Sequence, residues 1–173
     1  MKNVMKWVLI ACFAIGGSTA VLGQQLKLGY INANELFSIM PEQAAARAKL
    51  DTLGAELQDQ LELLQVEYNT KVQDYVKVAT TLSDSARALK DKELQDINQR
   101  IQESQQMAQE EFTAMQNSLF TPVVEKMQAT IDKVAQDNGM TAVFDLSVGS
   151  LIYQDTTTMI DMLPLVKAEL GIE

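Results

Sequence analysis

The chain has 173 residues, with 14 Lys and Arg against 23 Asp and Glu, no His and one Cys, which gives a formal net charge of −9. The lack of His excludes Ser-His and Cys-His nucleophilic sites and ordinary zinc sites, and the isolated glycines provide no phosphate-binding loop. We therefore expect neither an enzyme nor a cofactor, and the acidic balance disfavours nucleic acid as a partner.

Residues 1–23 have the pattern of a secretory signal. A basic start is followed by an apolar run over residues 7–15 and by small residues up to Gly23. This run is too short to span a bilayer, so we expect no stable membrane anchor. We place cleavage after Gly23, or alternatively after Ala20, so that the mature chain begins near Gln24.

The single cysteine, Cys12, lies inside this leader. Residues 9–12 resemble the lipobox of bacterial lipoproteins, which would make Cys12 a lipidation site, although the apolar run before it is short for that purpose. The alternative is that Cys12 is a small apolar residue of the signal core. In that case the mature chain has no cysteine and no disulfide framework.

The first part of the mature chain predicts a strand and a short helix. Residues 26–32 alternate apolar and polar side chains, as a half-buried strand does. Asn32 or Asn34 then caps a helix over residues 35–40, which Pro41 ends.

Residues 42–121 predict a long helical arm. They contain no proline and one glycine, and apolar side chains recur at three- and four-residue intervals. The short polar side chains of residues 80–85 interrupt this pattern, and Ser83 or Asp84 would cap a returning helix. We therefore predict an antiparallel helical hairpin, like a coiled coil, of roughly 60 Å at 1.5 Å per residue. The alternative is one continuous helix.

A second set of short elements follows the arm. Pro122 suits the first turn of a new helix over residues 123–136, and Gly139 ends that helix in a left-handed cap. Residues 141–146 and 151–154 then predict two strands.

The connections after the second strand complete the predicted body. Residues 147–150 have the length of a hairpin turn. Residues 155–158 cap a last helix that includes Ile160 and Leu170.

Together these elements make an α+β chain, mostly α, in which the arm is inserted into a small body formed by residues 24–41 and 122–173. The body has about seventy residues, which is marginal for an independent core, and its short strands leave open edges. Both difficulties disappear if several copies join their strands. The candidate residues of the shared core are Leu28, Tyr30, Val143, Phe144, Leu146 and Ile152.

The order and spacing of these elements resemble the Skp/OmpH family of periplasmic chaperones over the whole mature chain. The matching segments are residues 28–32, 40–42, the hairpin, 121–123, 137–145 and 153–158. The resemblance implies a periplasmic homotrimer, with a barrel of strands from three subunits and three helical arms around a cavity. It also implies binding of unfolded outer-membrane proteins there without ATP. The arms here are net acidic, whereas the best-known members have basic arms.

Two functions follow from these patterns. A holdase would offer adaptable apolar side chains on its arms, and the candidates are Met107, Phe112, Met115 and Leu119. The same residues could instead pack one helix of the hairpin on the other. The second function is a structural stalk or adaptor that docks on one specific partner of the cell envelope. A holdase should bind many unfolded chains, whereas an adaptor should bind one folded protein.

Overall fold

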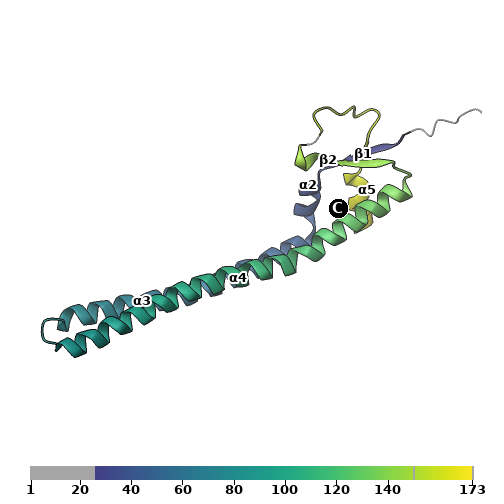
Figure 1. Ribbon diagram of the computed structural model, residues 1–173. Helices are drawn as coiled ribbons and strands as arrows, with labels where there is room; N and C mark the ends of the chain where they lie inside the picture. The colour runs from purple at the N-terminus through teal and green to yellow at the C-terminus, as the bar shows by residue number, and fades with distance from the viewer. Residues whose placement is uncertain (1–25, 150, 173) are drawn as a thin grey trace, which may run out of the picture.

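The computed structural model describes residues 26–149 and 151–172, and the expected signal segment with Cys12 lies outside these residues. Figure 1 shows a small body of strands and short helices from which one long helical hairpin projects. The far end of the hairpin is the turn between its two helices. The described part of the chain is thus mostly helical with a small sheet, as the sequence predicts.

The chain enters the body through a strand and a capped helix. Strand β1 spans Leu28–Ile31, and helix α2 spans Ala33–Ile39. Asn32 is the cap, because its side-chain oxygen accepts a hydrogen bond of 3.1 Å from the backbone N–H of Glu35. The cap lies at the first of the two positions expected, so the helix begins two residues earlier than predicted.

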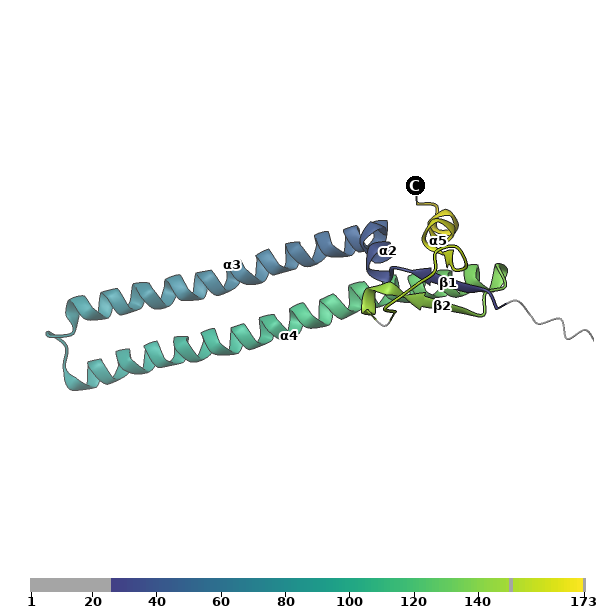
Figure 2. The ribbon, with the colours of Figure 1, turned by 90° about the horizontal axis from the view of Figure 1, so that it is seen from above.

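The arm consists of helix α3, Pro41–Val78, and the distal part of helix α4, Asp84–Asp137. Figure 2 shows the two helices running antiparallel beside each other. The Ser83 hydroxyl caps α4 by accepting a hydrogen bond of 3.3 Å from the Ala86 N–H. The predicted hairpin is confirmed, and the continuous helix is wrong because the chain reverses between Val78 and Asp84.

The prediction of a new helix at Pro122 is wrong. Helix α4 passes through Pro122 without interruption. Proline at this position removes one backbone donor but keeps a helical φ. On the following three turns, Val123, Met127 and Ile131 are buried, and this packing against the body continues the same helix past the proline. Gly139 then turns the chain with a φ of +65°, as expected.

The sheet has three parallel strands in the order β2-β1-β3. Strand β2 is Ala142–Asp145 and strand β3 is Ile160–Asp161. In this register Gly29 pairs with Val143, and Tyr30 pairs with Phe144. One face of the sheet lies against α4 and helix α5, Leu163–Leu170.

The predicted hairpin after β2 is wrong. Asp145 instead caps the 3₁₀ helix η1, Leu146–Val148, by accepting a 2.8 Å hydrogen bond from the Ser147 N–H. Residues 151–154 form no strand, and the third strand lies further along the chain and pairs in parallel with β1. A parallel partner requires a longer connection than a two-residue turn, and residues 146–159 supply it.

The last helix also begins later than predicted. Asp155 accepts a hydrogen bond of 2.9 Å from the Thr157 N–H inside a turn, and Ile160 belongs to β3 rather than to the helix. Helix α5 starts at Leu163, with Met162 as its cap residue.

The core of the body lies between the sheet and the helices α2, α4 and α5. Four of its side chains, Leu36, Met40, Met162 and Val166, are almost completely buried. At the junction with the arm, the rings of Phe37 and Phe120 are 5.8 Å apart at an angle of 52°. This aromatic contact joins α2 of the body to α4 at the base of the arm.

Candidate functional site

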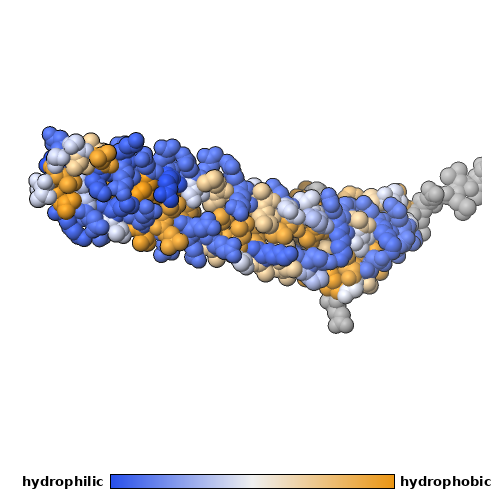
Figure 3. All heavy atoms as spheres, turned by 90° about the horizontal axis from the view of Figure 1, so that it is seen from below, coloured by the Kyte–Doolittle hydropathy of each residue, from blue (hydrophilic) through white to orange (hydrophobic). Residues whose placement is uncertain are grey.

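The arm exposes apolar side chains along its length. The largest exposed fractions belong to Leu63 with 70%, Val76 with 68% and Leu89 with 71%. Figure 3 shows apolar residues recurring between hydrophilic ones on one side of the arm. Leu63 and Val76 stand outside the three- and four-residue stripe that packs α3 on α4. Apolar residues off that stripe were therefore the signal that would have identified these positions from the sequence.

The four residues expected to contact a client divide into two pairs. Met107 and Met115 are exposed, at 60% and 38%. Phe112 is half-buried, and its ring lies 3.4 Å from the position that a Cβ atom on Gly54 would take. Leu119 is half-buried beside Pro122 at the base of the arm. Only the two methionines are accessible over much of their surface, since Phe112 and Leu119 lie between the helices.

One flank of the arm carries a network of ion pairs. Glu93 of α4 pairs with Lys71 of α3 and, at 2.8 Å, with Lys90. Hydrogen bonds from Lys71 and then Lys90 lower the pKa of Glu93 to about 2. Further toward the body, Arg100 lies 3.9 Å from Glu67. The Lys71–Glu93 and Arg100–Glu67 pairs link the two helices on this flank.

Among residues 26–149 and 151–172, none of the α-helices covers the outer face of the sheet. Side chains alternate between the two faces of a strand, and Gly29 and Ile31 are the buried pair of β1. Leu28 and Tyr30 therefore lie on the outer face, together with Phe144, which pairs with Tyr30 and is 36% exposed. Of the residues expected in a shared core, these three lie on one surface.

The other three residues expected in a shared core lie elsewhere. Val143 packs against the core of its own chain, on the face opposite Phe144. Leu146 is half-buried at the start of η1. Ile152 is completely exposed, and its neighbour Tyr153 is 81% exposed. Both belong to the segment that Figure 1 shows rising from the sheet on the side away from α4 and α5.

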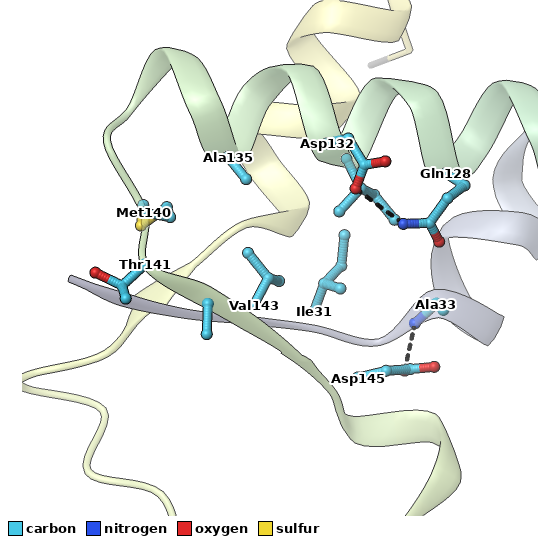
Figure 4. Close-up of a pocket in the computed structure, with 11 residues that line it drawn as sticks. Ile31, Ala33, Gln128, Asp132, Ala135, Met140, Thr141, Val143 and Asp145 are labelled. Atoms are coloured by element: carbon cyan, nitrogen blue, oxygen red, sulfur yellow. Dashed lines mark hydrogen bonds between the residues drawn. The ribbon is translucent and has the colours of Figure 1, made fainter. Parts of the chain in front are cut away.

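A hollow of about 240 Å³ opens beside the edge strand β2. Figure 4 shows Ile31 and Val143 pointing from the sheet toward Ala135 of α4 across it. At its end, Asp145 accepts a hydrogen bond of 3.1 Å from the Ala33 N–H. Burial raises the pKa of Asp145, but hydrogen bonds from Ser147 and Ala33 outweigh burial and leave that pKa below its usual value.

The described residues suggest neither a metal centre nor a membrane span. No group of three or more His, Cys, Asp and Glu side chains among residues 26–149 and 151–172 is placed to hold a metal ion. In the same part of the chain, none of the helices combines the length and the apolar character needed to cross a bilayer.

Comparison with known proteins places the chain in a family. The family model of the outer membrane protein (OmpH-like) family matches residues 27–170. The fold is similar to the crystal structure of an outer membrane chaperone (OmpH-like) from Caulobacter crescentus CB15. That similarity has a TM-score of 0.72 and 16% identity, and it covers 84% of this chain and 83% of the other. None of the curated proteins matches this chain. The chain belongs to the OmpH-like outer membrane protein family.

Proposed function

We propose that this protein is a periplasmic holdase chaperone, which binds unfolded outer-membrane β-barrel proteins between its helical arms without ATP. The observation that carries the proposal is the arm itself. Helix α3 has 38 residues, or about 57 Å at 1.5 Å per residue, and it exposes apolar side chains far from the body. The proposal agrees with the chaperone described for the similar Caulobacter structure.

The exposed side chains of the arm suit weak binding of many sequences. Leu63, Val76, Leu89 and Met107 are separated along the two helices rather than gathered in one pocket. Apolar contact is non-directional, and each such contact contributes little, so a client can exchange one for another. Methionine adds a flexible and polarisable surface. An adaptor for one folded partner would instead need a contiguous, complementary patch.

We further propose that three copies associate through their bodies. The outer face of the sheet exposes Phe144, and the adjacent connection exposes Val148, Ile152 and Tyr153. Such a concentration of large apolar side chains is typical of an interaction surface. The edge strand β2 also leaves backbone groups on its outer side open for pairing with a neighbouring copy.

The decisive experiment shortens the arm by five helical turns. Deleting residues 57–74 together with residues 90–107 removes eighteen residues from each helix and preserves the facing of the remaining side chains, since eighteen residues complete five turns. The body should remain folded and associated. Protection of an unfolded β-barrel protein against aggregation should fall strongly. Full protection by the shortened protein would place the client on the body, and binding of a single folded envelope protein instead would favour an adaptor.

Association is tested separately by native mass measurement. The chain from Gln24 onward should be trimeric, and Phe144→Asp should give monomers because it places a charge on the surface that we propose to be shared. Arg87→Asp at the tip of the arm is the control and should remain trimeric. A monomeric parent protein would contradict the proposed cavity.

A further inference from the structure

The two flanks of the arm differ in their chemistry. On α4, Ile97, Ile101 and Ala108 face α3 or lie next to it, and each residue of an α-helix is turned by about 100° from the one before. The residue directly after each of these three therefore lies on one flank of α4, and the residue directly before each lies on the other flank. The preceding positions include Asp96 and Arg100 of the ion-paired flank.

The flank of α4 that is formed by the residues after Ile97, Ile101 and Ala108 carries uncharged amides. We define the amide face by the residues that repeat at intervals of three, four and seven along one side of α4, all exposed: Gln95, Asn98, Gln102, Gln105, Gln109 and Gln116. No charged residue of α4 belongs to this repeat between Gln95 and Gln116. The surrounding arm, residues 42–121, has eight basic and fourteen acidic side chains, so this face is a neutral strip on an acidic arm.

The amide face contains a hollow whose floor is apolar. Its volume is about 290 Å³, and Gln58 of α3 lies on its rim with Gln105 and Gln109 of α4. Gly54 has no side chain to fill it, so the ring of Phe112 forms part of the floor. An apolar side chain can therefore enter between the helices while amides surround it.

The amides at the rim have unused hydrogen-bonding capacity. On the outward side of α4, Gln99 donates to Glu103 at 2.7 Å and Gln106 donates to Glu110 at 2.9 Å. Within the described part of the chain, the side chains of Gln58 and Gln105 make no such bond. Gln109 donates to the Thr113 hydroxyl at 3.2 Å, which uses one of its two amide N–H groups. A primary amide offers both a donor and an acceptor, which matches the peptide groups of an extended chain.

The length of the amide face matches that of one strand of a β-barrel. From Gln95 to Gln116 the helix rises by about 32 Å at 1.5 Å per residue. A membrane-spanning strand of a β-barrel has about ten residues and extends about 33 Å, and its apolar and polar side chains alternate. We propose that the amide face binds one unfolded β-barrel strand, lying extended along α4 with apolar side chains toward the hollow and backbone groups toward the amides. This inference rests on the proposed chaperone function.

The test uses a synthetic ten-residue peptide with alternating apolar and polar residues and no charge. Affinity is measured by fluorescence anisotropy for the chain from Gln24 onward and for Gln105→Glu/Gln109→Glu, which replaces donor amides by acceptor-only carboxylates. The matched control, Gln99→Glu/Gln106→Glu, adds the same charge on the outward side of α4. It also places more like charges four residues apart, so helix destabilisation is at least as large in the control.

We expect the Gln105→Glu/Gln109→Glu variant to bind the peptide at least tenfold more weakly and the control to change by less than twofold. Affinity should also rise from six to ten residues of peptide and then level off. Equal effects in the two variants, or affinity that keeps rising well beyond ten residues, would overturn the inference. A change in self-association without a change in peptide binding would make the occupant a second copy and would also overturn it.

Full-length unfolded β-barrel protein separates this inference from the proposed function. If the parent protein protects that client but neither binds the peptide nor depends on Gln105 and Gln109, the chaperone function stands and the amide face is wrong. If the parent protein does not bind the unfolded client at all, the proposed chaperone function and the proposed role of the amide face are both wrong.

Discussion

A methyl group added at Gly29 should strain the contact between β1 and the chain entering α5. A Cβ atom there would lie 2.9 Å from Cγ and 3.3 Å from Sδ of Met162, and 3.4 Å from Cγ2 of Val143. Met162 is completely buried, so its side chain has little room to move. Overpacking of this kind costs about 1 to 3 kcal/mol. Replacing glycine by alanine in a strand recovers about 0.5 to 1 kcal/mol of backbone entropy.

The overpacking should prevail, so Gly29→Ala should lower the free energy of unfolding by about 0.5 to 2 kcal/mol. The assay is urea unfolding followed by tyrosine fluorescence at a fixed protein concentration, because association also contributes to stability. Gly54→Ala is the contrasting variant. Its Cβ would meet only Phe112, at 3.4 Å, and alanine is favoured over glycine inside a helix by about 1 kcal/mol.

A double-mutant cycle identifies the contact. Met162→Ala alone should cost about 2 to 5 kcal/mol by leaving a cavity, and the methyl of Gly29→Ala should partly fill that cavity. The double variant should therefore be more stable than the sum of the single effects by about 1 kcal/mol. Strict additivity, or a Gly29→Ala protein as stabilised as Gly54→Ala, would refute the packing described between β1 and Met162.

Three further changes test other parts of the fold. Ser83→Ala should cost about 1 kcal/mol by removing the α4 cap, seen as earlier melting of helical circular dichroism, and unchanged melting would contradict the cap. Glu93 has a lowered pKa in the folded chain, so its ion pairs stabilise the arm fully at pH values above 4.5, the ordinary pKa of this carboxyl group. This stabilisation is lost as the pH falls toward about 2. Glu93→Gln should therefore flatten the decline in melting temperature over that pH range, whereas an unchanged slope would contradict this linkage. Asp145→Ala should cost about 1 to 3 kcal/mol in urea unfolding, because the Ala33 and Ser147 N–H groups lose their acceptor, and a neutral effect would contradict their dependence on it.

The sequence was sufficient for the arm because its elements are defined locally. Apolar spacing identifies the inner stripe of the helices, and Ser83 identifies the return. The cap at Asn32 is likewise a contact over three residues. Such features depend on residues close together in the sequence, so they can be predicted from the sequence pattern.

The body could not be predicted as well because its helix bounds and strand pairing depend on contacts between residues far apart in the sequence. Pro122 looks like a helix start, but the packing of Val123 and Met127 on the body continues the helix through it. Residues 151–154 look like a strand, yet β1 pairs instead with Ile160 and Asp161. Alternation shows which segments could form strands, whereas the choice of partner depends on the whole sheet.

The candidate client residues show the same division. The three- and four-residue spacing puts Phe112 on the inner stripe of α4 and Met107 beside it, but the sequence analysis named both as client contacts without using this difference. The structure puts Phe112 against Gly54 and leaves Met107 exposed. Gln105 and Gln109 were missed because surface amides carry no signal until the hollow beside them is known.

We propose that the arm, rather than the outside of the body, holds the client. The most direct measurement places a photoreactive amino acid at Met107 of the arm or at Leu165 of α5, which are 60% and 37% exposed. Each protein is irradiated with the same unfolded β-barrel client, and adducts are quantified by mass spectrometry. A client held by the arm should give strong adducts from position 107 and few from position 165, whereas the reverse distribution would place the client on the outside of the body.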